Sequence, residues 1–277
     1  MSPLEHDKAR LPLAWVRNHY RAFLVAVQFL TRLPTPPVDL GDETERRALL
    51  GRATAYFPAV GVLIGAGTGG LIVLASRVWP IGLAVVLGLA FEAVLTGAFH
   101  EDAVADFCDA FGGGWTRDDV LRILKDSRVG AFGALGLGLA VALRGGSIAA
   151  LDPDALFAAV LASASLGRWA ILPAMWALPP IAERASISRD IGQQIGPARL
   201  ALGTTMAGLG CLPLALTSPG RLGLALVAIV ALTTTLVIYV RGRLGGITGD
   251  CLGFLCYATQ VSTLLVLAAR WPRGNGG

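Results

Sequence analysis

Seven long apolar segments run through this chain of 277 residues, and each is close to the length that crosses a lipid bilayer. A helix needs about 20 predominantly apolar residues to span the hydrocarbon core. The segments are Ala53–Trp79, Pro80–Phe99, Ala131–Leu151, Ala155–Leu178, Leu200–Thr217, Leu222–Val240 and Cys251–Ala269, the first two separated only by Pro80. We therefore expect an all-α fold, a polytopic integral membrane bundle of about seven transmembrane helices.

The composition supports a membrane protein. Hydrophobic residues make up 54% of the chain and charged residues only 15%, whereas soluble domains carry about 25% charged residues. The lipid bilayer is thus the first expected partner. The net charge of +4 follows from membrane topology, and no nucleic-acid partner is indicated. The sequence leaves open a homo-oligomer or contacts with pathway partners.

The chain divides into residues 1–20, an expected N-terminal cytoplasmic tail, and residues 21–277, a single integral membrane domain. Residues 1–22 lack the apolar stretch of a cleavable signal peptide. The apolar run in Arg21–Pro37 is too short to span and ends in prolines, so it predicts an interfacial helix or a shallow re-entrant segment. Asp39–Arg52 is polar and predicts a short helix that leads into the first span.

The distribution of basic residues predicts the orientation. With a cytoplasmic N-terminus and seven spans, the inner segments hold 17 Lys and Arg residues. The outer side holds five, namely Arg77, Arg144, Arg221, Arg270 and Arg273. Cytoplasmic segments carry the excess of basic residues. This bias favours a multi-pass protein with its charged segments on the cytoplasmic side.

The most distinctive charged segment is Gly97–Gly114. If it is helical, Asp102, Asp106 and Asp109 lie within about 60° of one another on one face. Carboxylates beside a membrane are costly and mark functional sites, and an all-oxygen set suits Mg²⁺ better than zinc. His100 lies on another face of the helix, where it either faces a substrate or is an ordinary interfacial histidine.

Cationic and acidic groups elsewhere suit a polyphosphate. Lys125-Asp126-Ser127-Arg128 combines phosphate-binding groups with a further metal ligand, although the same residues also fit a membrane anchor. Asp250 opens the last span, and Arg241 and Arg243 precede it. Arg168 lies inside a span, where an unpaired charge is costly, and Glu92 in another span is a candidate partner. Such a pair would be purely structural.

These motifs resemble the cobalamin synthase, or adenosylcobinamide-GDP ribazoletransferase, family. The matching stretches are Phe29–Pro34, Tyr56–Pro58, Gly97–Ala110, Lys125–Gly133, Gly167–Trp169 and Gly245–Gly253. Four positions depart from the family pattern: Phe99 replaces leucine, Ala103 and Ala110 replace glycines, and Gln260 replaces a common glutamate. The Gln260 change puts any catalytic or ligand role at that position in doubt.

The resemblance implies a Mg²⁺-dependent transfer at the cytoplasmic face of the bacterial cytoplasmic (inner) membrane. A ribosyl hydroxyl of α-ribazole, or of its 5′-phosphate, attacks the cobinamide-linked phosphorus of adenosylcobinamide-GDP, and GMP leaves. We expect His100, Asp106 and Lys125 to be catalytic. We expect substrate contacts from Arg32, Ser127, Arg128, Arg168 and Arg243. The expected metal ligands are Asp102, Asp106, Asp109, Asp126 and Asp250.

Two other functions compete with this interpretation. A CDP-alcohol phosphotransferase also uses an aspartate cluster at a membrane face, but this chain lacks the Ala-Arg of that motif and spaces its acids differently. An ion-coupled transporter would place charges near the midplane of the bilayer, and only Glu92 and Arg168 are clearly within spans. The chain also shows no internal repeat of the kind that builds many transporters.

Overall fold

The computed structural model describes residues 3–181 and 195–270, with side chains from residue 15 onward. Within these residues the regular structure is helical, apart from one isolated β-bridge between Pro180 and Ile247. Six helices are long and apolar enough to cross a membrane, or seven if the bent pair α4–α5 forms one span. The predicted all-α, multi-pass architecture is confirmed.

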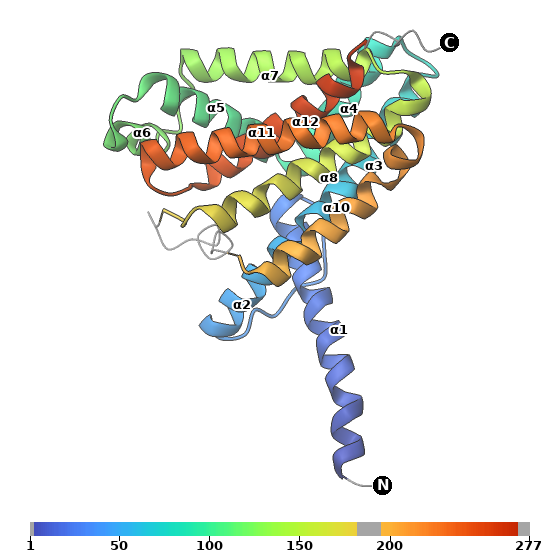
Figure 1. Ribbon diagram of the computed structural model, residues 1–277, viewed down its shortest axis with the longest axis vertical. Coiled ribbons are helices and arrows are strands. Elements are labelled where there is room, and N and C mark those ends of the chain that lie inside the picture. Colours follow the sequence, from blue (N-terminus) through green and yellow to red (C-terminus); the bar gives the residue numbers. More distant parts are fainter. Residues whose placement is uncertain (1–2, 182–194, 271–277) are drawn as a thin grey trace.

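The helices follow one another with short connections (Figure 1). Their bounds are α1 (Pro3–Leu30), α2 (Glu43–Ala53), the 3₁₀ turn η1 (Thr54–Tyr56), α3 (Phe57–Ala75), α4 (Ile81–Thr96), α5 (Phe99–Gly113), α6 (Arg117–Ile123), α7 (Ala131–Ala149), α8 (Pro153–Ala177), α10 (Pro197–Thr217), α11 (Pro219–Leu244) and α12 (Gly249–Ala268). Six of the seven predicted segments each coincide with a spanning helix.

Helix α8 forms the centre of the bundle and packs against α3, α10 and α12. Small residues make this packing close: a Cβ on Gly61 or Gly65 of α3 would collide with atoms of α8 around Ala164 and Leu161. Helices in lipid associate through such small-residue contacts, because hydrocarbon offers no hydrophobic drive between them. The interior is therefore held together by backbone proximity along α8.

The predicted span Pro80–Phe99 ends earlier than expected. Helix α4 stops at Thr96, and α5 leaves at 90° to it. Gly97 and Ala98 both adopt left-handed backbone conformations, with φ of 71° and 57°. An alanine in this region costs about 1–2 kcal/mol. The turn is supported from outside, because the backbone N–H of Arg32 donates to the Leu95 carbonyl at 2.7 Å.

The N-terminal helix extends farther than the short segment predicted for Arg21–Pro37. It begins at Pro3, leaves the body of the molecule (Figure 1) and ends at Leu30, before the proline-rich stretch. Its last turns pack into the bundle, where Val27 and Leu30 contact a core that includes Phe57 and Met175. The expected domain boundary at residue 20 falls inside this helix, and the division remains a prediction.

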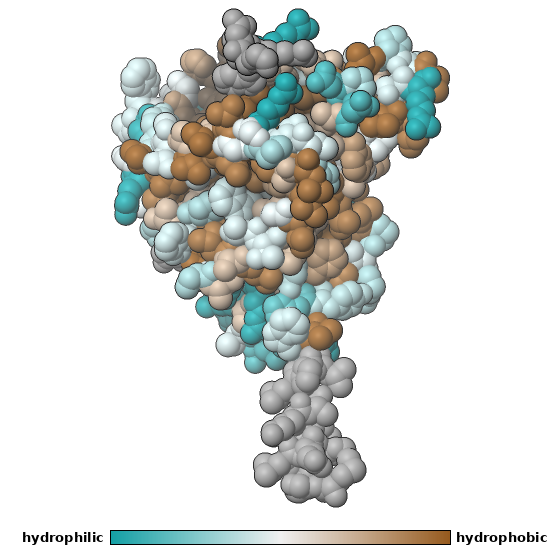
Figure 2. Space-filling model, turned by 45° about the vertical axis from the view of Figure 1, so that its right-hand side comes forward, coloured by the Kyte–Doolittle hydropathy of each residue, from teal (hydrophilic) through white to brown (hydrophobic). Residues whose placement is uncertain are grey.

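Apolar side chains also cover the outside of the helical body. Figure 2 shows brown and pale residues over most of the visible surface between the two ends of the molecule. Val94, Leu216 and Val227 are 74%, 77% and 68% exposed on their helices. Extensive exposed apolar surface marks contact with a partner or a membrane. Lipid provides that contact for spanning helices.

The segments that carry the charged motifs gather at one end of the bundle, on the left in Figure 1. They are α2, the α5–α6–α7 connection and the α11–α12 turn. The assignment of Arg144 to the outer side was wrong. This residue is 1% exposed and lies inside α7, so it belongs to neither surface. Arg184, Arg189 and Arg273, also used in the orientation prediction, lie outside the described residues.

Candidate active site

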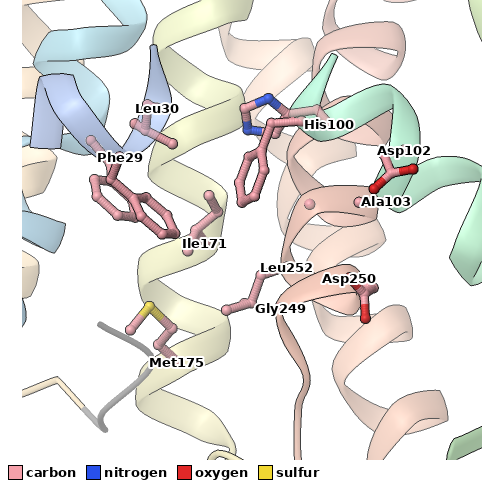
Figure 3. A pocket seen from close by; sticks show the side chains of 13 residues that line it. Phe29, Leu30, His100, Asp102, Ala103, Ile171, Met175, Gly249, Asp250 and Leu252 are labelled. Carbon is pink, nitrogen blue, oxygen red and sulfur yellow. The ribbon is translucent and has the colours of Figure 1, made fainter. Parts of the chain in front are cut away.

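A cavity of about 230 Å³ opens at this end of the bundle, between the end of α1, the first residue of α3, the first turn of α5, α8 and the first turn of α12 (Figure 3). Three of the predicted site residues line it, namely His100, Asp102 and Asp250. The remainder of the wall is apolar and is formed by Phe29, Leu30, Phe57, Phe99, Ala103, Ile171, Met175, Leu252 and the two glycines Gly249 and Gly253.

The two carboxylates reach the cavity from different helices. Asp102 lies in the first turn of α5, and Asp250 in the first turn of α12, which is capped by the Thr248 hydroxyl. Figure 3 shows both carboxylates on the same side of the cavity. Asp106, one turn further along α5, is close enough to both for their charges to act on it. The predicted acidic stripe is thus helical and converges with Asp250.

His100 is buried, at 2% exposure, and borders the cavity. Its ring lies edge-on to Phe99, with centroids 5.3 Å apart. Its Nε2 atom has no hydrogen-bond partner among the described residues. A buried nitrogen without a partner costs about 1–3 kcal/mol. His100 is therefore a cavity-lining residue with a buried ring nitrogen that no described group satisfies.

Asp109 has a role that the sequence did not predict. Its two oxygens accept hydrogen bonds from the backbone N–H groups of Gly130 and Gly133, both at 2.7 Å. These groups are at the N-terminus of α7, whose free N–H groups favour a negative partner. Asp109 is therefore a cap that α5 supplies to another helix.

The Lys125-Asp126-Ser127-Arg128 motif lies in the turn between α6 and α7. Arg128 donates to both carboxylate oxygens of Asp126 and lowers the pKa of that carboxyl to about 2. The motif does not line the cavity. It is connected to the acidic helix through Asp109, which lies about 10 Å from Asp102 at 1.5 Å rise per residue. A pyrophosphate with its attached groups can extend over that distance.

Two further predicted substrate contacts hold backbone elements instead of lining the cavity. Arg243 at the end of α11 donates to the Gly114 carbonyl at 2.6 Å and lies over the Phe111 ring. It therefore holds the C-terminus of α5. The Arg32 side chain lies against Gly97, where a Cβ would collide with its guanidinium, so it flanks the α4–α5 turn.

Arg168 is fully buried and belongs to a network of charges behind the cavity. It lies 3.7 Å from Glu92, the partner predicted from the sequence. Arg144, which the sequence placed outside, makes the shorter pair with Glu92 at 2.7 Å and also donates to Gln260 at 2.9 Å. The missed signal was that Arg144 lies well within an apolar segment, where an unpaired charge is costly.

Comparison with known proteins connects this geometry to a family. A family model described as cobalamin-5-phosphate synthase matches residues 22–268. The chain belongs to the cobalamin-5-phosphate synthase family. The match begins in α1 and continues through α12, so it includes every element that borders the cavity. The resemblance inferred from the motifs is confirmed, as is the prediction that the chain is an enzyme, a transferase of cobalamin biosynthesis.

Relatives of the cobalamin-5-phosphate synthase family align with nearly the whole chain. A protein from Leptospira interrogans is 32% identical over 92% of this chain and 98% of its own length. One from Ralstonia nicotianae is 36% identical over 92% and 96%, and one from Rhizobium etli 37% over 88% and 94%. All three are named adenosylcobinamide-GDP ribazoletransferase. No solved structure matches the chain.

The carboxylates of this family member suit a metal ion whose coordination shell is completed by the substrate. Among residues 3–181 and 195–270, no three Asp, Glu, His or Cys side chains are placed to hold a metal ion by themselves. Mg²⁺ is usually held by one or two carboxylates together with water and substrate phosphates, without an all-protein cage. Asp102 and Asp250, facing one cavity with Asp106 beside them, fit that pattern.

Proposed function

We propose that the chain joins adenosylcobinamide-GDP to α-ribazole, or to α-ribazole 5′-phosphate, and releases GMP. A ribosyl hydroxyl oxygen forms the new bond to the cobinamide-linked phosphorus, the bond from that phosphorus to GMP breaks, and the hydroxyl proton is released. The product is adenosylcobalamin, or its 5′-phosphate. Membership of the family supports the reaction. The observation that carries it is the convergence of His100, Asp102 and Asp250 on one cavity.

In this proposal Asp102, Asp106 and Asp250 contribute to a Mg²⁺ site whose coordination is completed by water and substrate phosphates. Bound there, the ion would neutralise charge on the pyrophosphate, which is the main requirement of phosphoryl transfer. Asp109 and Asp126 are left out of the metal site, because Asp109 caps α7 and Asp126 is occupied by Arg128. The proposed metal site therefore keeps three of the five ligands expected from the sequence.

The remaining side chains bind or orient the substrates. His100, which lines the cavity, orients the incoming ribosyl hydroxyl or accepts its proton. Lys125, Ser127 and Arg128 supply donors for the phosphates at the α6–α7 turn. Donors that are already positioned where charge develops lower the barrier without reorganisation.

We place this end of the bundle on the cytoplasmic side of the bacterial inner membrane. Setting aside the buried Arg144 increases the imbalance of basic residues, since 17 inner charges then face four outer ones (five less Arg144). The motif-bearing segments gather at the same end in Figure 1. Nucleotide substrates are available on that side.

The decisive experiment uses purified protein in detergent with adenosylcobinamide-GDP, α-ribazole and Mg²⁺. We expect equimolar GMP and cobamide, both dependent on Mg²⁺. Release of CMP from a CDP-alcohol would instead support the phosphotransferase alternative, and ion flux without either product would support a transporter. The family match over residues 22–268 supports neither the phosphotransferase nor the transporter.

Site variants connect the activity to the cavity. We expect Asp106→Asn to abolish turnover while the protein still folds and inserts. Asp118→Asn is the matched control, because this aspartate of α6 has a side chain that is 96% exposed. Full turnover by Asp106→Asn would refute the metal assignment, and loss of turnover in both variants would show a nonspecific effect.

A further inference from the structure

The proposed reaction assigns no role to the apolar half of the cavity. We propose that it is the binding site for the bicyclic aromatic base of α-ribazole, with the attached ribose extending toward Asp102 and Asp250. This inference rests on the proposed function. It identifies which substrate occupies the cavity and how that substrate is oriented there. Three observations carry it: the size of the cavity, the character of its wall and the distribution of its polar atoms.

The size restricts the occupant to one small ring system. A water molecule takes about 30 Å³ in the liquid, and pockets for drug-sized ligands measure about 300–1,000 Å³. The cavity, at about 230 Å³, lies between these values. A corrin macrocycle does not fit into it. A flat bicyclic base does, while the corrinoid partner remains outside the opening.

The wall favours an apolar aromatic group. Phe29 stacks on Phe57 with centroids 5.7 Å apart, and Phe99 meets Phe29 edge-on at 5.3 Å. Ile171 and Met175 of α8 complete this apolar part of the wall (Figure 3). Aromatic rings pack well in stacked and edge-to-face arrangements, and thioethers make favourable contacts with rings.

The few polar atoms distinguish this base from guanine. Guanine carries several donors and acceptors, and an apolar wall would leave them unpaired at about 1–3 kcal/mol each. The base of α-ribazole carries one free ring nitrogen and two methyl groups, and is otherwise hydrocarbon. The α-ribazole base therefore brings one polar atom into the apolar half of the cavity, where guanine would bring several.

The polar edge of the cavity then sets the direction of the ribose. Figure 3 shows Phe29 on one side of the cavity and the carboxylates of Asp102 and Asp250 on the other. A base held among the phenylalanines directs its sugar toward these carboxylates. The reacting hydroxyl therefore approaches the phosphorus from inside the protein, and the nucleotide leaves toward the solvent.

The test compares how two cavity variants treat the two substrates. Phe99→Ala removes part of the aromatic wall, and we expect it to raise the KM for α-ribazole about ten-fold, which corresponds to ~1.4 kcal/mol. The KM for adenosylcobinamide-GDP should not change. Phe91→Ala is the matched control, because Phe91 on α4 is 38% exposed, Phe99 is 39% exposed, and only Phe99 lines the cavity.

Met175→Phe reduces the cavity and tests the fit directly. We expect it to weaken α-ribazole binding, measured by equilibrium dialysis without the second substrate. On the same substitution, the α-riboside of unmethylated benzimidazole should lose less affinity than α-ribazole does, because the smaller base still fits the reduced cavity. A single methyl group in a fitted pocket changes binding about 10–200-fold. Thermal unfolding confirms that both variants fold.

The outcomes separate this inference from the proposed function. A wild-type protein that binds α-ribazole but makes no GMP would refute the proposed reaction and leave the site assignment standing, provided that Met175→Phe weakens that binding. An active wild-type protein whose KM for adenosylcobinamide-GDP rises in Phe99→Ala would overturn the assignment to α-ribazole. Unchanged α-ribazole binding in both cavity variants would overturn it as well.

Discussion

Ala103 on α5 lies directly against Gly253 on α12, and a Cβ added to Gly253 would overlap the Cβ of Ala103. The two helices therefore cross at the closest approach that their side chains allow. Asp102 is adjacent to this crossing, and Asp250 lies one turn before it. The contact between a methyl group and a bare glycine brings carboxylates that are 148 residues apart to the same cavity.

Gly253→Ala should accordingly separate the two carboxylates. We expect a loss of about 1–3 kcal/mol in unfolding free energy from overpacking. Turnover should fall by up to about 10²-fold, because small displacements of reacting groups have effects of that size. Thermal unfolding in detergent and GMP release measure the two effects.

A matched control and a rescue make the Gly253 prediction specific. Gly138→Ala also adds a methyl group within a helix, but nothing lies within 4 Å of that position, so neither stability nor turnover should fall. Ala103→Gly combined with Gly253→Ala should recover most of the turnover. Equal losses in the Gly253 and Gly138 variants would contradict a role for the crossing.

Asp109→Asn should weaken the start of α7. The amide retains one acceptor oxygen but turns an NH₂ group toward the second backbone N–H, which costs about 1–3 kcal/mol. We expect faster amide exchange at Gly130 and Gly133 and a lower unfolding temperature. The Mg²⁺ concentration for half-maximal turnover should stay at the wild-type value. A raised Mg²⁺ requirement with unchanged amide exchange would restore Asp109 to the metal site.

Glu92→Gln should be among the most destabilising single changes in the bundle. It leaves the buried guanidinium groups of Arg144 and Arg168 without the carboxylate that both approach. Removing one partner of a buried pair costs about 3–5 kcal/mol. The double variant Glu92→Gln with Arg144→Met should recover part of that loss, as measured by unfolding of the detergent-solubilised protein. No recovery would argue against charge as the cause.

The spanning helices were predictable because hydropathy is a local property. Each segment of about 20 apolar residues must cross or avoid the bilayer as a unit, and six segments do form spanning helices. The acidic stripe was predictable for a similar reason, since helical periodicity alone places Asp102 and Asp106 on one face. Asp250 was identified by its position at the start of a span and by the family motif.

Features made by long-range contacts were not predictable in this way. Arg144 pairs with Glu92 and Gln260, which come from two other helices. The turn at Ala98 uses a backbone conformation that alanine rarely adopts, and no residue type signals it. Phe29 and Met175 resemble ordinary core residues in the sequence. Only the packing of five separate helices, α1, α3, α5, α8 and α12, leaves a cavity between them.

Arg243→Lys tests whether Arg243 binds substrate, as the sequence predicted, or holds α5, as its contacts indicate. The guanidinium donates to the Gly114 carbonyl and to the Tyr239 hydroxyl, and it lies over the Phe111 ring. A lysine cannot reproduce this planar fork. We expect the C-terminus of α5 to loosen and kcat to fall about ten-fold, with the KM for adenosylcobinamide-GDP unchanged.

Arg241→Lys, at an exposed position on the same helix end, should have no effect. A rise in that KM with kcat and thermal stability intact would instead establish Arg243 as a substrate contact, because a residue that only holds α5 has no direct means of changing substrate affinity.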